Sequence, residues 1–238
     1  AEHVARLSMK IWHQHHENDI LMTDLWTVVG ALLCLEDKQL QVLEILHDPI
    51  QSVIHSVVHG KGDLGTMEEQ AIELMGKIFS VPSQDPEILL THFFSLLVED
   101  LMNTVDPQAL QTGCETFRFL LRNTAPLWTK WTYKDENILQ WCLKVIHRAA
   151  TCEHENAALY SSFIIIQLFK KLPEAMQEYT EDLMNLVVHT LASSHWKPLI
   201  QSMCSVICQL YIMHGTGVLG ALSSLELTVP PPPSDRHS

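Results

Sequence analysis

Histidine and cysteine are the residues of this chain whose types and spacing could support chemistry. Two groups contain several potential zinc ligands close together: His13, His15 and His16, and then His147, Cys152 and His154. A structural zinc ion needs four converging ligands, usually supplied as two close pairs, and neither group has a partner pair at a recognisable spacing. A metal site stays one alternative, but we expect solvated histidines near helix C-termini, where the helix dipole favours positive charge.

The six cysteines give no sign of a disulfide framework. They are Cys34, Cys114, Cys142, Cys152, Cys204 and Cys208. No two are spaced as CxxC and most lie in apolar helical patterns, which predicts reduced, buried thiols and an intracellular protein. Cys204 and Cys208 stand four residues apart, but their Cβ atoms diverge on a helix, so we expect core packing rather than a redox pair.

Motifs for catalysis or cofactor binding are not evident. No GxxxxGK[ST], GxSxG or HExxH occurs, and the glycine group GKGDLG at 60–65 lies between two expected helices rather than after a strand. A Cys nucleophile with a His base could be drawn from many pairs, which makes any one pair uninformative. We therefore expect no enzyme, no catalytic residues and no cofactor. The first residues, AEHVARLSMK, lack the regions of a signal peptide, and we expect a piece of a longer polypeptide.

Composition favours a helical globular protein with a protein partner. The chain has 238 residues, 47% of them hydrophobic, with nine glycines and few clusters of β-branched residues, so it can bury a large core of helices. Its 15 Lys and Arg against 28 Asp and Glu give a net charge of −13. This balance disfavours nucleic acid, whose phosphates require local Lys and Arg, and matches a basic partner.

An uncharged run from Pro198 to Leu225 raises the question of a membrane span. Within it Gln201, Ser205 and Gln209 recur every four positions as one polar stripe, whereas a spanning helix needs about 20 mostly apolar residues. The apolar residues that recur at helical spacing opposite this stripe are Ile200, Met203, Cys204, Ile207, Leu210 and Tyr211. We expect an amphipathic helix buried between neighbouring helices, and no membrane span.

Two kinds of predicted helix alternate along the chain at one period. Aligning the first kind on Phe79, Leu121, Phe169 and Tyr211 gives spacings of 42, 48 and 42 residues. Aligning the second kind on Ile54, Leu97, Leu143 and Leu186 gives 43, 46 and 43. A helical hairpin repeated every 40 to 47 residues or so is typical of HEAT and armadillo proteins, whose hairpins stack because none buries its apolar faces alone. The predicted fold is all-α, an α-solenoid of such hairpins.

The repeat predicts three parts. Residues 48–228 would hold about four hairpins, residues 1–47 would form N-terminal helices that fit no repeat cleanly, and residues 229–238 would be a proline-rich, flexible tail. Helix starts are predicted at Asp48-Pro49, Thr66 with Glu69, Asp85-Pro86 and Asp106-Pro107.

Acidic residues and tryptophans are the candidate contacts for a partner. The acidic series comprises Glu99, Asp100, Asp135, Glu136, Glu181 and Asp182, which belong to consecutive helices of the second kind or to their first turns. In a stack these carboxylates could face a basic partner, although carboxylates near helix starts are also favoured by the dipole and can simply be solvated. Trp128 and Trp131 are candidate exposed anchors for a partner; the alternative is that they fill the gap between stacked repeats.

Residues 169–219 resemble the karyopherin-β superfamily of importins and exportins. The resemblance lies in Lys197, in the helix from Ile200 to Tyr211 and in the break from Gly215 to Leu219. It implies a carrier that binds protein cargo on a concave, often acidic face, a Ran-type GTPase mainly through N-terminal repeats, and Phe-Gly nucleoporins between outer helices. It also implies a location in the cytoplasm and the nucleus. No residue of this chain matches the GTPase contacts of the family.

We therefore predict a non-enzymatic, protein-binding segment of a nuclear transport receptor. The alternative is a HEAT-repeat scaffold subunit of a stable multiprotein complex, which would use a large apolar contact patch with little salt dependence.

Overall fold

A computed structural model describes residues 1–35, 37–59, 86–215 and 218 of the chain. In these residues almost all regular structure is helical, which confirms the predicted all-α class. The helices are α1 (Glu2–His15), α2 (Asp19–Leu33), α3 (Gln39–Ile45), α4 (His47–His59), α6 (Pro86–Asn103), α7 (Pro107–Thr124), α8 (Ile138–Thr151), α9 (Glu155–Lys171), α10 (Pro173–Met176), α11 (Thr180–Ser193) and α12 (Lys197–His214). The 3-10 turns η1 (Ala125–Leu127) and η2 (Gln177–Tyr179) and the short strands β1 (Thr132–Tyr133) and β2 (Glu136–Asn137) lie between them.

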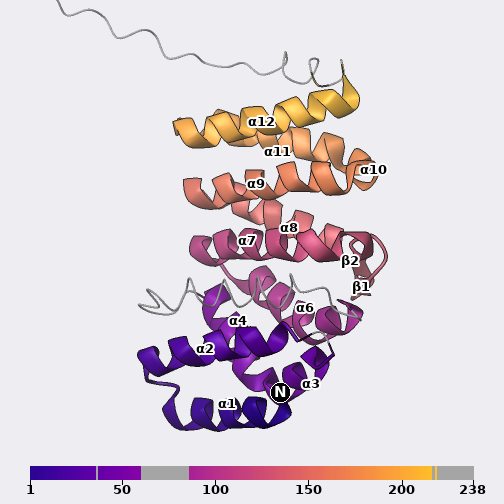
Figure 1. Cartoon of the computed structure of the whole chain (residues 1–238). Coiled ribbons are helices and arrows are strands. Elements are labelled where there is room, and N and C mark those ends of the chain that lie inside the picture. Colours follow the sequence, from indigo (N-terminus) through magenta and orange to yellow (C-terminus); the bar gives the residue numbers. More distant parts are fainter. Residues whose placement is uncertain (36, 60–85, 216–217, 219–238) are drawn as a thin grey trace, which may run out of the picture.

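From α6 onward the helices lie in two rows, one layer stacked on the next (Figure 1). The first row contains α7, α9 and α12, and α9 packs against both of the others. The second row contains α6, α8 and α11, and α8 packs against both α7 and α9 of the first row. The rows match the two kinds of predicted helix: Leu121, Phe169 and Tyr211 lie in the first, and Leu97, Leu143 and Leu186 in the second. The position of Phe79 lies outside the described residues.

The hydrophobic core runs continuously through these layers, and α9 lies at its centre. Small residues on α9, among them Ala157, Ser161 and Ser162, are fully buried and allow the helices on three sides to approach closely. The buried hydroxyls are satisfied, because Ser161 donates to the carbonyl of Ala158 at 2.7 Å and Ser162 meets the hydroxyl of Ser202 in α12. Burial of α9 therefore depends on the layers above and below it.

Polar side chains fix where two of these helices begin. Asp106 accepts a hydrogen bond from the Gln108 amide at 2.9 Å, with Pro107 in the first turn, as predicted. A capping box that was not predicted starts α8, where the Asn137 and Gln140 side chains accept from each other's backbone amides at 2.9 and 2.8 Å.

The helix predicted to start at Asp48-Pro49 begins slightly earlier in the chain, so this prediction is wrong in its exact position. Helix α4 begins at His47, directly after α3, and Asp48 lies inside its first turn rather than at the cap. Only Leu46 separates the two helices, and its apolar side chain cannot accept a hydrogen bond from a backbone amide. Helix α6 begins at Pro86, where a start was predicted, although Asp85 itself lies outside the described residues, as does the predicted start at Thr66.

Arg148 ties α8 to the end of α6. Its two terminal guanidinium nitrogens donate to the backbone carbonyls of Leu101 and Thr104. These carbonyls lie at the C-terminal end of α6, where the last C=O groups of a helix lack intrahelical partners and where the dipole favours a cation. The Arg148 side chain therefore satisfies carbonyl groups at the end of α6 and at the same time holds α8 against α6.

Part of the face of α12 that was expected to be buried is exposed. Its buried apolar residues, each at most 2% exposed, are Leu199, Met203, Val206 and Leu210. Cys204 and Cys208 are exposed, as are Tyr211 at 47% and Ile212 at 74%. The prediction that both cysteines pack in the core is therefore wrong, because in the described part of the chain α12 is covered on one side only.

The described helices include none with the combination of length and apolarity needed to cross a bilayer.

Gly113 in α7 permits a close approach of α6. A Cβ atom at this position would lie 2.6 Å from Cδ2 of Leu101, whose side chain is fully buried. We expect Gly113→Ala to lower the free energy of unfolding by about 1–3 kcal/mol through overpacking, although Ala is the better helix former. Urea denaturation followed by circular dichroism measures the change.

Leu101→Ala provides the matched background for this test. With the Leu101 side chain shortened, the added methyl group has space, so Gly113→Ala should cost much less than in the wild-type chain. An equal cost in both backgrounds would contradict a steric origin.

Candidate functional site

An open groove of about 540 Å³ lies between α8 and α11. Leu183 and Leu186 of α11, 3% and 6% exposed, lie in its apolar floor together with Leu143 of α8. Polar side chains such as Gln140 and Asn185 line it as well. A concave site with an apolar floor and a few convergent polar groups is typical of a binding site.

The groove was not predicted from the sequence, although a signal for it exists. The lining residues of α8 are Gln140, Leu143, Lys144, His147 and Thr151, and those of α11 are Asp182, Leu183, Asn185, Leu186 and His189. On each helix they recur three or four positions apart and so share one face. The repeat period makes these two helices neighbours, and comparing their faces would have found the groove.

Charge in the groove is unevenly distributed. Glu136 accepts hydrogen bonds from Lys144 at 2.5 and 2.6 Å, so these two charges are paired with each other. Asp182, in the first turn of α11, forms no ion pair with any described residue. Tyr179 also lines the groove, and burial raises the pKa of its hydroxyl. The groove therefore offers one uncompensated carboxylate beside an apolar floor.

A second hollow of about 920 Å³ extends the groove past the end of α8. Thr151 and His189 line both hollows, so the two are adjacent along the same pair of helices. Glu153 and Glu155 line the second hollow, and Glu155 accepts a hydrogen bond from Ser194 at 2.9 Å. Carboxylates thus outnumber lysine along the whole groove, which favours a ligand with positive charge.

Three members of the acidic series have partners within the chain. Glu99 accepts hydrogen bonds from the Tyr133 hydroxyl and from Lys134 at 2.7 Å. Asp100 lies 3.1 Å from Nδ1 of His55. Glu136 pairs with Lys144 in the groove described above. These carboxylates are therefore less available to a partner than the sequence suggested.

The other three members of the series are exposed, and they occupy two kinds of position. Asp135 lies in the turn of the β1–β2 hairpin with φ 64°, not in the first turn of a helix as predicted. Glu181 and Asp182 lie in the first turn of α11, as predicted. The groove brings together two members of the series, Glu136 and Asp182.

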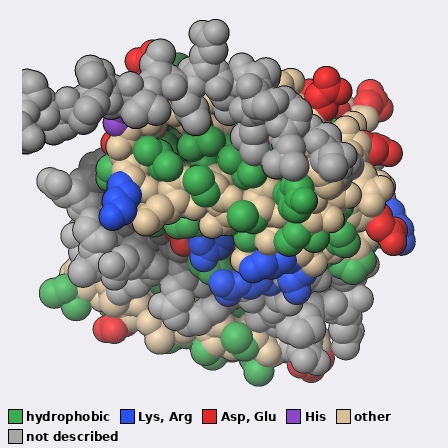
Figure 2. Space-filling view, turned by 90° about the horizontal axis from the view of Figure 1, so that it is seen from above, with side chains coloured by type: hydrophobic (Ala, Val, Ile, Leu, Met, Phe, Trp, Pro, Cys, Tyr) green, Lys and Arg blue, Asp and Glu red, His purple; other side chains and the backbone are tan. Residues whose placement is uncertain are grey.

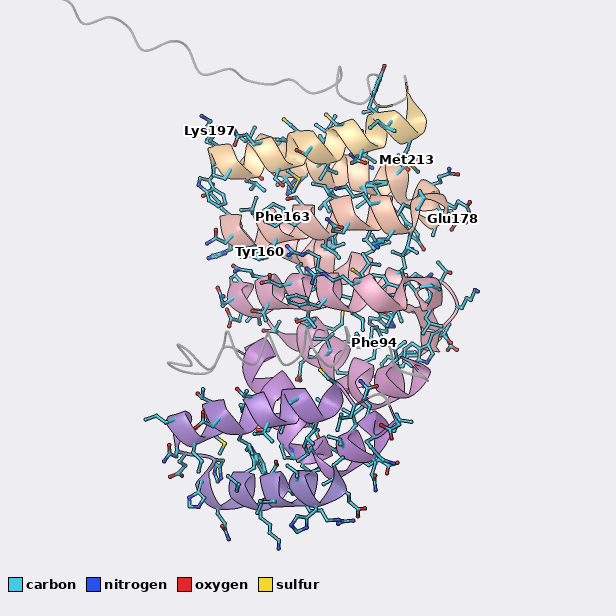
Figure 3. The ribbon with its side chains drawn as sticks, viewed as in Figure 1. Phe94, Tyr160, Phe163, Glu178, Lys197 and Met213 are labelled. Atoms are coloured by element: carbon cyan, nitrogen blue, oxygen red, sulfur yellow. The ribbon has the colours of Figure 1, made fainter. Side chains whose placement is uncertain are left out.

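The two candidate anchor tryptophans are buried to different degrees. Trp128 is 0% exposed and its Nε1 donates to Thr124 at 2.9 Å, so it is not an exposed anchor. Trp131 is partly buried and meets Phe94 edge to face, with ring centroids 5.3 Å apart. Phe94 also meets Phe117, and Figure 3 shows it where α6 lies beside α7. The alternative reading, in which the tryptophans fill the gap between repeats, describes Trp128 correctly.

The residues singled out for metal or thiol chemistry form no such site in the described part of the chain. No group of three or more His, Cys, Asp or Glu side chains converges there in a way that could hold a metal ion. Burial raises the pKa of the Cys142 thiol and that of Cys114, which keeps both protonated. The prediction of buried thiols is confirmed for these two and wrong for Cys34, which is exposed.

One spacing was overlooked in the sequence: Gly215, Gly217 and Gly220 in GTGVLG match the pattern GxGxxG. The dinucleotide-binding fingerprint requires this pattern after a strand and before a helix, whereas here it follows α12. Most of it lies outside the described residues. The pattern therefore supplies no argument for a nucleotide site.

Comparison of the chain with protein-family models finds no match, and comparison with curated proteins finds none either.

The contacts of Glu99 predict a carboxyl group that is unusually acidic. The hydrogen bond from Lys134, then that from Tyr133, lowers the pKa of Glu99 below the ordinary value of 4.5. Because the pKa falls on folding, the interaction stabilises the fold above pH 4.5 and is lost as the pH drops below that value. Carbon-detected NMR titration of the glutamate carboxyl groups measures it directly.

Lys134→Ala should raise the pKa of Glu99 back toward 4.5, whereas Lys38→Ala, which removes a distant lysine, should leave it unchanged. A Glu99 titration that does not respond to Lys134→Ala would show that this contact does not form in solution.

Proposed function

We propose that this chain is a non-enzymatic, protein-binding segment built as an α-solenoid of HEAT/armadillo-like hairpins, with the α8/α11 groove as its partner site. The observation that carries the proposal is the groove itself, an open, apolar-floored channel with excess carboxylates between successive helices of one row. The solenoid class is supported by the sequence period of 42 to 48 residues and by the packing of α9 against the layers on either side.

The dimensions of the groove suit an extended segment of a partner. Helix α8 has 14 residues and so is about 20 Å long, which corresponds to about six residues of extended chain. Apolar side chains of such a segment would contact Leu143 and Leu186, while a Lys or Arg would face Asp182. The partner class is therefore a protein segment that combines basic and apolar residues.

Within this class we infer a carrier of protein cargo, part of a nuclear transport receptor of the karyopherin-β kind. The support is the resemblance of residues 169–219 and the acidic character of the groove. Under this proposal the chain works in the cytoplasm and nucleus, and a Ran-type GTPase and nucleoporins are further partners that bind elsewhere on the receptor.

One observation favours the alternative of a scaffold subunit. The exposed face of α12 has no charged residue from Pro198 to His214 and carries Tyr211 and Ile212. Uncharged, partly apolar helix faces of this kind are suited to permanent contacts with further helices. A scaffold would bind through this face with little dependence on salt.

Titration of the chain into a fluorescent Lys/Arg-rich peptide that also contains leucines tests the partner class. We expect saturable binding, because the peptide's cations face Asp182 and its leucines enter the groove. Binding should weaken at higher salt, since the charges at the rim are partly exposed. Replacing Glu136→Gln and Asp182→Asn together should weaken binding about tenfold.

Asp24→Asn with Glu44→Gln is the matched control, because it removes the same charge from exposed positions on α2 and α3. The control should bind like the wild-type chain. Equal weakening by both double variants would mean that net charge alone attracts the peptide, and the groove would lose its assignment.

A further inference from the structure

A further hollow, separate from the α8/α11 groove and its extension, lies between α7 and α9 in the other row of helices. Its volume is about 350 Å³, and its lining includes Arg118, Arg122, Phe163, Ile166 and Lys171. Helix α7 contributes two arginines and Leu121, and α9 contributes the lysine together with Phe163 and Ile166. The hollow thus combines three cations with an apolar wall, which is the reverse of the charge in the α8/α11 groove.

Among the described residues, the cations of this hollow have few acidic neighbours. Arg122 and Lys171 form no ion pair with the described residues, and Arg122 instead lies over the Phe119 ring at 5.0 Å. Arg118 has one contact, to Glu115 at the outer limit of 4.0 Å. In a chain with net charge −13, three cations at one site with a single distant carboxylate among the described residues are unusual and indicate an anionic ligand.

Helix ends explain only part of this arrangement. Arg122 lies in the last turn of α7, and Lys171 in the last turn of α9, where the dipole favours cations. That effect does not account for Arg118, which lies further from the end, nor for the hollow beside it. The dipole also does not account for Phe163, which is partly exposed. Its ring centroid lies 5.6 Å from that of Tyr160, also on α9 (Figure 3).

We propose that the α7/α9 hollow binds an acidic segment of a partner protein, in which Asp or Glu residues flank an apolar side chain. The carboxylates would pair with Arg118, Arg122 and Lys171, and arginine suits this role because its planar guanidinium can hold a carboxylate through two hydrogen bonds. The apolar side chain would lie against Phe163 and Ile166.

The chemistry of the hollow favours an acidic protein segment over the other anionic surfaces. A nucleic acid or a bilayer spreads its charge over a long distance and binds extended basic stripes, and here the cations are few and the chain as a whole is strongly acidic. Seen from above α12, several Lys and Arg side chains gather beside hydrophobic side chains in the lower middle of the view, and most acidic side chains lie further out (Figure 2). A short apolar and acidic segment matches a hollow of this size.

This inference does not rest on the proposed function. The two sites lie in different rows of helices and share no lining residue. Each can therefore fail without the other, and their variants distinguish them.

The test uses a fluorescein-labelled peptide with a Leu-Phe pair between short runs of glutamate, titrated with the intact chain at low and physiological salt. We expect saturable binding that Arg122→Gln with Lys171→Gln weakens about tenfold, the size expected when two partly exposed charge pairs are lost. Lys10→Gln with Lys130→Gln removes the same charge from exposed positions elsewhere and should leave binding unchanged. Phe163→Ala should weaken binding without reducing its salt dependence.

Two further arms separate the classes of ligand. A matched peptide with glutamine in place of glutamate should not bind, and vesicles containing phosphatidylserine should not bind at physiological salt. The proposal is overturned if the glutamine peptide binds equally well, if the vesicles bind and the peptide does not, or if Arg122→Gln with Lys171→Gln leaves peptide affinity unchanged. Circular dichroism of each variant verifies that it is folded.

Discussion

The structure depends on the mutual burial of successive helix layers. Helix α9 shows the constraint most clearly, because it is covered by α7, α8 and α12 and contributes buried residues toward all three. Small side chains such as Ala157 and Ser161 bring these helices close, and the hydrophobic effect over the shared surface provides most of the stability. A single hairpin removed from the stack would expose that surface, so no layer is stable by itself.

Polar contacts act on top of this burial and set the register between layers. Arg148 joins α8 to the carbonyl end of α6, Ser162 meets Ser202 between α9 and α12, and Ser194 reaches back to Glu155. Each contact crosses from one layer to the next. The same layering leaves hollows between neighbouring helices of a row, and the side chains on the facing surfaces decide the charge of each hollow. One row therefore presents an acidic groove and the other a basic hollow.

The periodic pattern predicted the helices and their alternation well, because buried positions recur at the spacing that each helix imposes. It could not predict how completely a given face is covered, which depends on neighbours outside the helix: Cys204 and Cys208 lie in an apolar pattern but are exposed. Trp128 shows the opposite error, since this tryptophan was a candidate exposed anchor and is instead fully buried, edge to face with Phe117. The sequence identified the acidic residues, but it did not predict that Glu99 pairs with Lys134 and Glu136 with Lys144, because these contacts depend on the β1–β2 hairpin.

Hydrogen–deuterium exchange of the chain with and without a saturating Lys/Arg-rich peptide tests the central claim most directly. The account predicts slower amide exchange in residues 136–151 and 179–189, where α8 and α11 border the acidic groove, with little change in 107–124. Protection confined to 107–124 and 155–171, or an unchanged exchange pattern under conditions in which the peptide is bound, would contradict it.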